Sequence, residues 1–170
     1  EMNLRGIALS TFLYAVENEK ILKNKSIIFY NNKNASNNKK IIFKFKKRFK
    51  TIGISDFKNI DEFKTKFKID YIYTQKGGEK DDWVSNKIKT IVHAVYPQKL
   101  NQVHGHKYAY ISEWASKEFS NNKIPYIPLI VTTDLTTQDL KRRLNIKKNS
   151  IVFGCYGGSS SFDLKFVQDA

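Results

Sequence analysis

The last part of the sequence carries residue types that could hold an anion. Residues 151–155 are apolar or small and predict a buried strand, Gly157 and Gly158 follow it, and Phe162 begins a helical pattern. Glycine allows the positive φ of a tight turn, and the free N–H groups at a helix N-terminus attract negative charge. The sequence therefore predicts an anion site at Gly157 and Gly158, although the same pattern also fits a strand–helix connection that binds no ligand.

A second polar stretch, residues 75–83, follows another predicted strand. Open α/β sheets bind their ligands at the carboxyl ends of the strands, so Lys76, Gly77 and Gly78 are candidates for contacts with a polar ligand. The alternative is a plain turn from the strand into a short helix whose first turn carries an aspartate.

Histidines supply the candidates for proton transfer. His104 and His106 flank a glycine in a loop, residues 96–107, that also follows a predicted strand. An imidazole in such a loop could act as an acid, a base or a phosphate contact. The spacing is a poor zinc pattern and no carboxylate cluster accompanies it, so no metal site is predicted. His93, inside an apolar strand, is predicted to be a core histidine whose hydrogen bonds are satisfied.

Alternating strands and helices must position these residues. Strands are predicted over residues 26–30, 51–54, 70–74, 90–95, 108–112 and 151–155, and helices over residues 7–22, 39–49, 56–67, 113–119, 136–144 and 162–170. This order predicts an α/β fold with one doubly wound, mostly parallel, Rossmann-like sheet and helices on both of its faces. The carboxyl edge of that sheet is expected to collect the candidate site residues Arg5, Gly6, Lys76, Gly77, Gly78, His104, His106, Gly157 and Gly158.

The charge balance is strongly basic. Lysine and arginine outnumber aspartate and glutamate by 30 to 16, which gives a net charge of +14. The lysines come with many asparagines and isoleucines, a mixture that an A- and T-rich genome also produces, so the charge alone does not indicate nucleic-acid binding. The densest basic block, residues 39–50, predicts an amphipathic helix whose lysine face is either solvated or in contact with anionic lipid.

The cysteine content and the hydropathy indicate the compartment. A single cysteine, Cys155, excludes an internal disulfide and a cysteine-based zinc cluster, and it fits a reducing environment. No apolar run approaches the ~20 residues of a membrane span. A cytoplasmic location is therefore expected, with peripheral contact to an anionic membrane as a further option.

Several segments, taken in order, resemble a bacterial-type glycosyltransferase of the GT-B fold. The resembling segments are RG at 5–6, LYAVENEKILKNKSIIFY at 13–30, GEKDDW at 78–83, IVHAV at 91–95, HGHKYAYISEW at 104–114 and IVFGCYGGSSSFDLKFV at 151–167. The resemblance implies that residues 1–149 are most of the Rossmann-like, acceptor-side domain. Residues 150–170 would then be the first strand and helix of a donor-side domain, so that the fold is truncated at both ends.

The sequence departs from the family pattern in three places. The first strand of the acceptor-side domain is expected before Glu1, Pro128 is followed by Leu129 where a Pro-His pair is expected, and most of the donor-side domain is absent. The isolated chain is therefore expected to have little or no transferase activity.

The resemblance implies sugar transfer from a nucleotide-sugar donor to a glycan or another hydroxyl acceptor. His104 or His106 would deprotonate or orient the acceptor, Arg5 with Gly6 would contact phosphate, and the N–H groups of Gly157 and Gly158 would lie near the donor. The sequence has no Asp-x-Asp motif, so neither a metal nor another cofactor is expected. The alternative is a non-catalytic basic α/β module that binds an anionic membrane or nucleic acid, with nucleic acid the less favoured partner.

Overall fold

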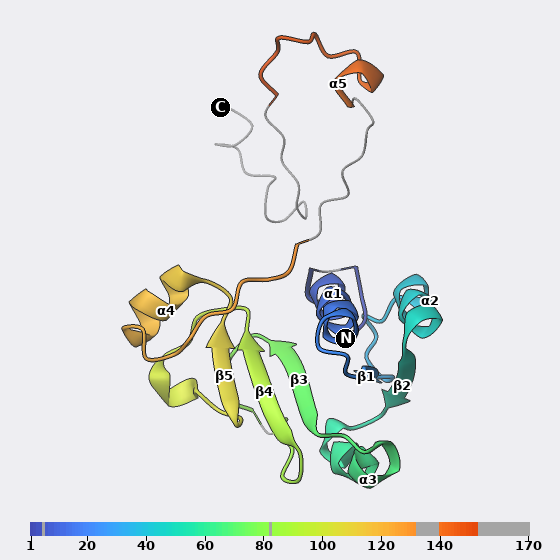
Figure 1. Cartoon of the computed structure of the whole chain (residues 1–170), viewed down its shortest axis with the longest axis vertical. Coiled ribbons are helices and arrows are strands. Elements are labelled where there is room, and N and C mark those ends of the chain that lie inside the picture. The colour runs from blue at the N-terminus through green and yellow to red at the C-terminus, as the bar shows by residue number, and fades with distance from the viewer. Residues whose placement is uncertain (5, 82, 132–139, 153–170) are drawn as a thin grey trace. The chain divides into compact units, whose positions relative to one another are not determined.

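The computed structural model describes residues 1–4, 6–81, 83–131 and 140–152 (Figure 1). The chain divides into two compact units, Glu1–Thr132 and Thr133–Ala170. In the second unit, α5 (Leu140–Arg143) lies within the helix predicted over 136–144, and Lys141 Nζ donates to the carbonyl oxygen of Ser150 at 2.8 Å. The helix predicted over 162–170 lies outside the described residues, and the domain boundary expected at residue 149 stays a prediction.

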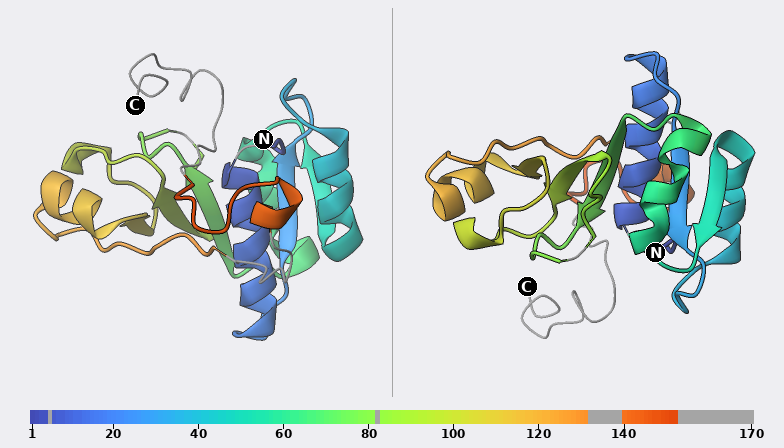
Figure 2. Two further views of the ribbon diagram at one scale, coloured as in Figure 1. Left: turned by 90° about the horizontal axis from the view of Figure 1, so that it is seen from above. Right: turned by 90° about the horizontal axis from the view of Figure 1, so that it is seen from below.

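The first unit is an α/β structure with parallel sheets, as the alternation of elements predicts. Its two-stranded sheet pairs β1 (Ile27–Asn31) with β2 (Lys50–Ile54), and its three-stranded sheet has the order β3 (Tyr71–Lys76), β4 (Lys89–Ala94) and β5 (Lys107–Tyr110). The prediction of one sheet that contains all of these strands is wrong, because β1 and β3 do not pair. Instead, helix α1 (Gly6–Lys20), dark blue in Figure 2, lies beside both sheets.

The two-stranded sheet shares a hydrophobic core with α1 and α2 (Lys39–Arg48). Asn38 caps α2, because its Oδ1 accepts the N–H groups of Lys40 and Ile41 at 2.9 and 3.3 Å. The buried residues of this core are Met2, Ala15, Ile28, Phe45 and Phe49. Helix α2 therefore confirms the amphipathic helix that the spacing of its apolar residues predicts.

The helix predicted over 56–67 is shorter and less regular than expected. It consists of η1 (Phe57–Glu62), a 3-10 helix, followed by α3 (Phe63–Phe67). Asp56 caps η1 by accepting the N–H of Lys58 at 2.9 Å, and the left-handed residue Lys68 (φ 51°) ends α3. The rings of Phe63 and Phe67 pack on Phe29 of β1, with centroids 5.3 and 6.4 Å away.

The three-stranded sheet has a hydrophobic core on the face opposite α1. Val92, Ala94, Tyr108 and Tyr110 form it with Ala115 of α4 (Glu113–Ser120). Beyond β5 the chain returns through a parallel bridge between Tyr110 and Tyr126. Among the described residues, none of the helices combines the length and apolarity that crossing a bilayer requires.

The connections between these strands differ from the prediction. No helix occurs in the described part of residues 77–88, where a short one was an expected alternative, and residues 95–106 hold only η2 (Leu100–Gln102). In place of helical hydrogen bonds, side-chain oxygens accept from the backbone N–H groups. Asp81 Oδ1 accepts from Trp83 N–H at 3.0 Å, and Ser85 Oγ accepts from Ile88 N–H at 2.7 Å. Such short-range bonds compete with helix formation.

Two phenylalanines on α2 provide a test of this packing. Phe45 is 2% exposed and Phe43 is 60% exposed. We expect Phe45→Ala to lower the free energy of unfolding by about 3–5 kcal/mol, because it leaves a cavity in the core. The matched variant Phe43→Ala should change it by less than about 0.5 kcal/mol. Urea unfolding measures both, and comparable losses would contradict the assigned orientation of α2.

Candidate active site at the carboxyl edge of the parallel strands

Polar side chains from α1, β3 and β4 meet near the carboxyl ends of the two strands. Tyr73 and Gln75 lie two positions apart in β3 and so share a face, and Gln75 is in register with His93 of β4. Ser10 and Tyr14 contact the same face from α1. We call these residues of α1, β3 and β4 the polar cluster.

Hydrogen bonds run through the polar cluster without interruption. Gln75 Nε2 donates to Ser10 Oγ and to Tyr73 Oη, each at 2.8 Å. Tyr73 Oη lies 2.8 Å from His93 Nδ1, and His93 Nε2 lies 2.8 Å from the carbonyl oxygen of Ile127. The chain of bonds therefore links α1, β3, β4 and the segment that follows α4.

Tyr14 closes one side of the cluster. Its ring stacks on Tyr73, with centroids 5.1 Å apart and planes at 28°, and its plane is nearly perpendicular to that of His93, with centroids 5.7 Å apart. The Tyr14 hydroxyl donates to the carbonyl oxygen of Pro128 at 2.7 Å. Residues 127 and 128 are thus held to the cluster by both Tyr14 and His93.

The partners of His93 fix where the protons lie. A carbonyl oxygen only accepts, so Nε2 of His93 must carry a hydrogen to bond Ile127. In the neutral ring Nδ1 is then an acceptor, and the Tyr73 hydroxyl donates to it while its oxygen accepts from Gln75. The polar cluster therefore has a single direction of donation, from Gln75 through Tyr73 to His93.

Burial keeps the two titratable groups of this hydrogen-bond chain, the imidazole of His93 and the hydroxyl of Tyr73, in their neutral forms. It lowers the pKa of His93, because the charged imidazolium would lose its hydration, and the bonds to backbone groups of Ile127 and Tyr110 oppose that shift only in part. Burial likewise raises the pKa of the Tyr73 hydroxyl. The cluster is therefore suited to orienting a hydroxyl group by hydrogen bonds rather than to binding an anion.

Gln75 leaves one acceptor of the cluster open. Both hydrogens of its amide are used, whereas its Oε1 is buried and has no hydrogen-bond partner within the described part of the chain. A buried acceptor of this kind is satisfied by an ordered water or by a donor from a ligand.

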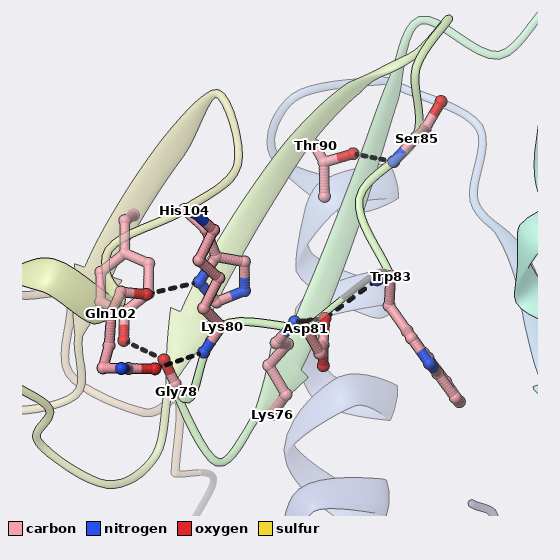
Figure 3. Close-up of polar contacts among 10 residues, drawn as sticks. Lys76, Gly78, Lys80, Asp81, Trp83, Ser85, Thr90, Gln102 and His104 are labelled. Carbon is pink, nitrogen blue, oxygen red and sulfur yellow. Dashed lines mark hydrogen bonds and ion pairs between the residues drawn. The ribbon is translucent and has the colours of Figure 1, made fainter.

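The loop after β3, which the sequence predicts to contact a ligand, instead makes an ion pair and hydrogen bonds within the protein (Figure 3). Lys76 Nζ forms an ion pair with Asp81, and its side chain is only 14% exposed. The carbonyl oxygen of Gly77 accepts from the N–H of Tyr96 at 3.1 Å, so this loop is tied to the end of β4. In this structure, the ion pair of Lys76 with Asp81 stabilises the loop.

Gly78 has a structural reason to be glycine. Its φ is +114°, and a Cβ there would lie 2.8 Å from the carbonyl oxygen of Tyr96 and 2.9 Å from the hydroxyl of Tyr108. That hydroxyl donates to the carbonyl oxygen of Gly78 at 2.8 Å, and burial raises the pKa of Tyr108 to about 12. Gly78 therefore allows the loop to pack closely on β5.

His104 lies in the same loop packing. It is buried, and its Nδ1 donates to the carbonyl oxygen of Gln102 at 2.7 Å, while Gln102 Oε1 accepts from the N–H of Lys80 at 2.9 Å (Figure 3). The His104 ring also contacts Tyr108, with centroids 5.6 Å apart. Its Nε2 is buried and has no partner among the described residues. The structure thus brings His104 together with Gly78, both against Tyr108.

His106 lies at the opposite edge of the sheet. Its Nδ1 accepts from the N–H of Thr90 at 3.1 Å, beside the first residues of β4 and β5. The expectation that His106 joins the carboxyl edge is wrong, because a parallel connection must return to the amino edge before the next strand begins. The catalytic roles of His104 and His106 stay predictions.

The remaining predicted site residues are only partly described. Gly6 begins α1, and a Cβ there would meet no atom within 4 Å, so crowding does not require glycine at this position. Arg5, Gly157 and Gly158 lie outside the described residues. The convergence of the other site residues with these three therefore stays a prediction. In the described ranges, histidine, cysteine, aspartate and glutamate form no group of three that could hold a metal ion.

A groove of the described surface lies apart from the polar cluster. It has a volume of about 360 Å³, and its lining includes Phe57, Asp61, Trp83 and Ser85, with the rings of Phe57 and Trp83 stacked at 4.7 Å. None of the residues of the polar cluster lines this groove. Shape alone therefore does not single out the carboxyl edge. The feature that points to this edge is the buried Oε1 of Gln75, which has no hydrogen-bond partner among the described residues.

Comparison with protein-family models, with curated proteins and with solved structures finds no match for this chain.

Sequence reasoning found His93 but missed its partners. His93 is 1% exposed with both ring nitrogens bonded, which confirms the prediction of a satisfied core histidine. Tyr73 and Gln75 do not stand out in the sequence, because tyrosine and glutamine also occur in strands without a functional role. The available signal was their alternation, since polar residues two apart in a strand next to a buried histidine would share its face.

Adjacent glycines separate packing from ligand binding in the loop after β3. We expect Gly78→Ala to lower the free energy of unfolding by about 1–3 kcal/mol, because of its positive φ and the contacts of the added Cβ. Gly77→Ala should be close to neutral, since its Cβ would meet nothing nearer than 4.0 Å. Thermal and urea unfolding measure the difference. A neutral Gly78→Ala would remove the structural explanation for that glycine.

The neutral state of His93 makes stability depend on pH. Below its ordinary pKa of about 6.5 the unfolded chain takes up a proton that folded His93 resists, so the free energy of unfolding should fall from pH 7 to pH 5, by at most about 1.4 kcal/mol per pH unit. His93→Gln should flatten this dependence. Urea unfolding across this range decides, and equal slopes for wild type and His93→Gln would contradict the assignment.

Proposed function

We propose that this chain is the acceptor-side part of a glycosyltransferase of the GT-B fold, which transfers a sugar from a nucleotide-sugar donor to a hydroxyl acceptor. One observation carries the proposal: the segments that resemble the family coincide with the elements of a parallel α/β unit in the expected order. The glycine of RG is the first residue of α1, IVHAV covers the last four residues of β4 and the residue after it, and HGHKYAYISEW runs from the loop before β5 into α4. A chance resemblance would not need to respect these boundaries.

The chemistry sets what such a site must provide. The bond between the anomeric carbon and the donor phosphate breaks, a bond to the acceptor oxygen forms, the acceptor proton passes to a base and a nucleoside diphosphate leaves. The acceptor-side domain must therefore hold a neutral hydroxyl in line with the donor, which is a task of orientation.

The polar cluster has the properties for that task. It lies near the carboxyl ends of parallel strands, where α/β proteins bind ligands. Its aromatic stack of Tyr14 on Tyr73 offers an apolar wall, and Gln75 Oε1 offers an acceptor that no other described residue bonds. We propose that the cluster orients the acceptor, while Arg5, Gly157 and Gly158 remain the proposed contacts to the donor phosphates and sugar.

The test uses the whole protein that the gene encodes, these 170 residues included. It is incubated with uridine, guanosine, thymidine and cytidine nucleotide sugars, with and without mixed glycan acceptors, and release of the nucleotide is measured. We expect acceptor-dependent release from one donor class. The absence of such release from every donor, in a protein that is folded by circular dichroism, would contradict the proposed function.

A second arm tests the acceptor site. Gln75→Ala should lower kcat/KM by about tenfold, since it removes one oriented hydrogen bond. Gln98→Ala, in the loop after β4, is the matched control and should leave kcat/KM nearly unchanged. Equal losses in the two variants would contradict the role of Gln75 while leaving the transferase activity itself established.

A further inference from the structure

The outward face of α2 carries an exposed aromatic ring surrounded by lysines. Phe43 is 60% exposed, although its neighbours on the other side of the helix are in the core. Residues three and four positions apart are neighbours on a helix surface. For Phe43 these neighbours are all exposed lysines: Lys39, Lys40, Lys46 and Lys47.

Folding does not account for the position of Phe43. The core is served by Phe45 and Phe49, and the Phe43 ring contacts instead the ammonium group of Lys47, 4.7 Å from its centroid. Helix α2 contains no acidic residue that could neutralise its lysines. An exposed ring in a basic face that no acidic residue of the same helix neutralises indicates a surface with an anionic and partly apolar partner.

A small apolar groove continues this surface towards α1. It has a volume of about 200 Å³, and its lining includes Leu4, Leu9, Phe12 and Lys44. Leu4 and Leu9 are 79% and 53% exposed. The ammonium group of Lys44 lies 4.8 Å from the centroid of the Phe12 ring, at the border between the groove and the basic face.

We propose that this face of α2, made of Lys39, Lys40, Phe43, Lys46 and Lys47, binds the anionic surface of a lipid bilayer. The lysines lie at the level of the lipid headgroups, and the Phe43 ring enters the boundary between headgroups and acyl chains. Long lysine stems can bury their methylene groups there and keep the ammonium groups in water. The proposal goes beyond the transferase reaction and does not depend on it.

The side chains favour lipid over nucleic acid. Nucleic-acid recognition relies on arginine forks and on aromatic platforms that stack bases. The arginine of α2, Arg48, pairs with Glu19 at 2.6 Å, and Phe43 is the exposed aromatic residue of the helix. Lysines around one apolar ring match a headgroup layer, which offers diffuse negative charge above an apolar interior.

The first experiment measures vesicle binding by the whole chain. Cosedimentation compares vesicles of equal parts phosphatidylcholine and phosphatidylserine with vesicles of phosphatidylcholine alone. We expect binding to the anionic vesicles only, and weaker binding as salt is raised, because exposed charges are screened within about 8–10 Å at physiological ionic strength. Equal binding to both vesicle types, or no binding to either, would overturn the proposal.

Paired charge variants locate the surface. Lys46→Gln with Lys47→Gln should weaken binding by about 25-fold, since each lysine near an anionic surface contributes about fivefold. Lys117→Gln with Lys123→Gln removes the same charge from exposed positions in and after α4, and should leave binding nearly unchanged. Equal losses from both pairs would mean that net charge, rather than α2, drives binding.

A matched pair of aromatic variants tests insertion. Phe43→Ala should weaken binding by about tenfold through the loss of partial ring burial, whereas Phe119→Ala, which removes a partly exposed ring from α4, should not. Circular dichroism verifies that each variant is folded. Full binding by Phe43→Ala would overturn the insertion of the ring. Tighter binding to single-stranded RNA than to the anionic vesicles, lost with Lys46 and Lys47, would assign the face to nucleic acid instead.

Discussion

The first unit depends on the fact that α1 is shared by two sheets that do not pair with each other. Phe12 presents its ring to Phe45 and Phe49 in the core of the two-stranded sheet, with centroids 5.2 and 5.3 Å apart. Tyr14, two positions on and therefore on the other side of the helix, packs on Tyr73 and His93 of the three-stranded sheet. Anything that displaces α1 disturbs both packings at once.

The two contacts of α1 differ in physical character. The aromatic contact with α2 is tolerant, because dispersion and apolar burial are not directional. The contact through the polar cluster is demanding, since each buried donor must meet one acceptor, and a buried group left unpaired costs about 1–3 kcal/mol. The position of α1 along β3 is thus fixed by the hydrogen bonds among Ser10, Gln75, Tyr73 and His93.

Local pattern was sufficient for the strands and for the longer helices of the first unit, but not for the pairing of the strands or for the connections between them. The strand around His93 and the helix that carries Phe45 follow from apolar spacing alone. The separation of β1 from β3 depends on chain segments far apart in sequence, which no local pattern records. The direction of a parallel connection decided the position of His106, and short-range bonds from residues such as Ser85 replaced a predicted helix. The polar cluster could not be predicted from the sequence, because its residues indicate a site only when the fold brings α1, β3 and β4 together.

The edges of β1 and β3 carry a consequence for assembly. Within the described part of the chain, β1 pairs only with β2, and β3 pairs only with β4, so each has a row of backbone groups that no strand bonds. The same rows are templates for β-augmentation by a foreign strand or a second copy of the chain. The solubility of the protein would then depend on its concentration and on any strand that pairs with these edges, as much as on its net charge.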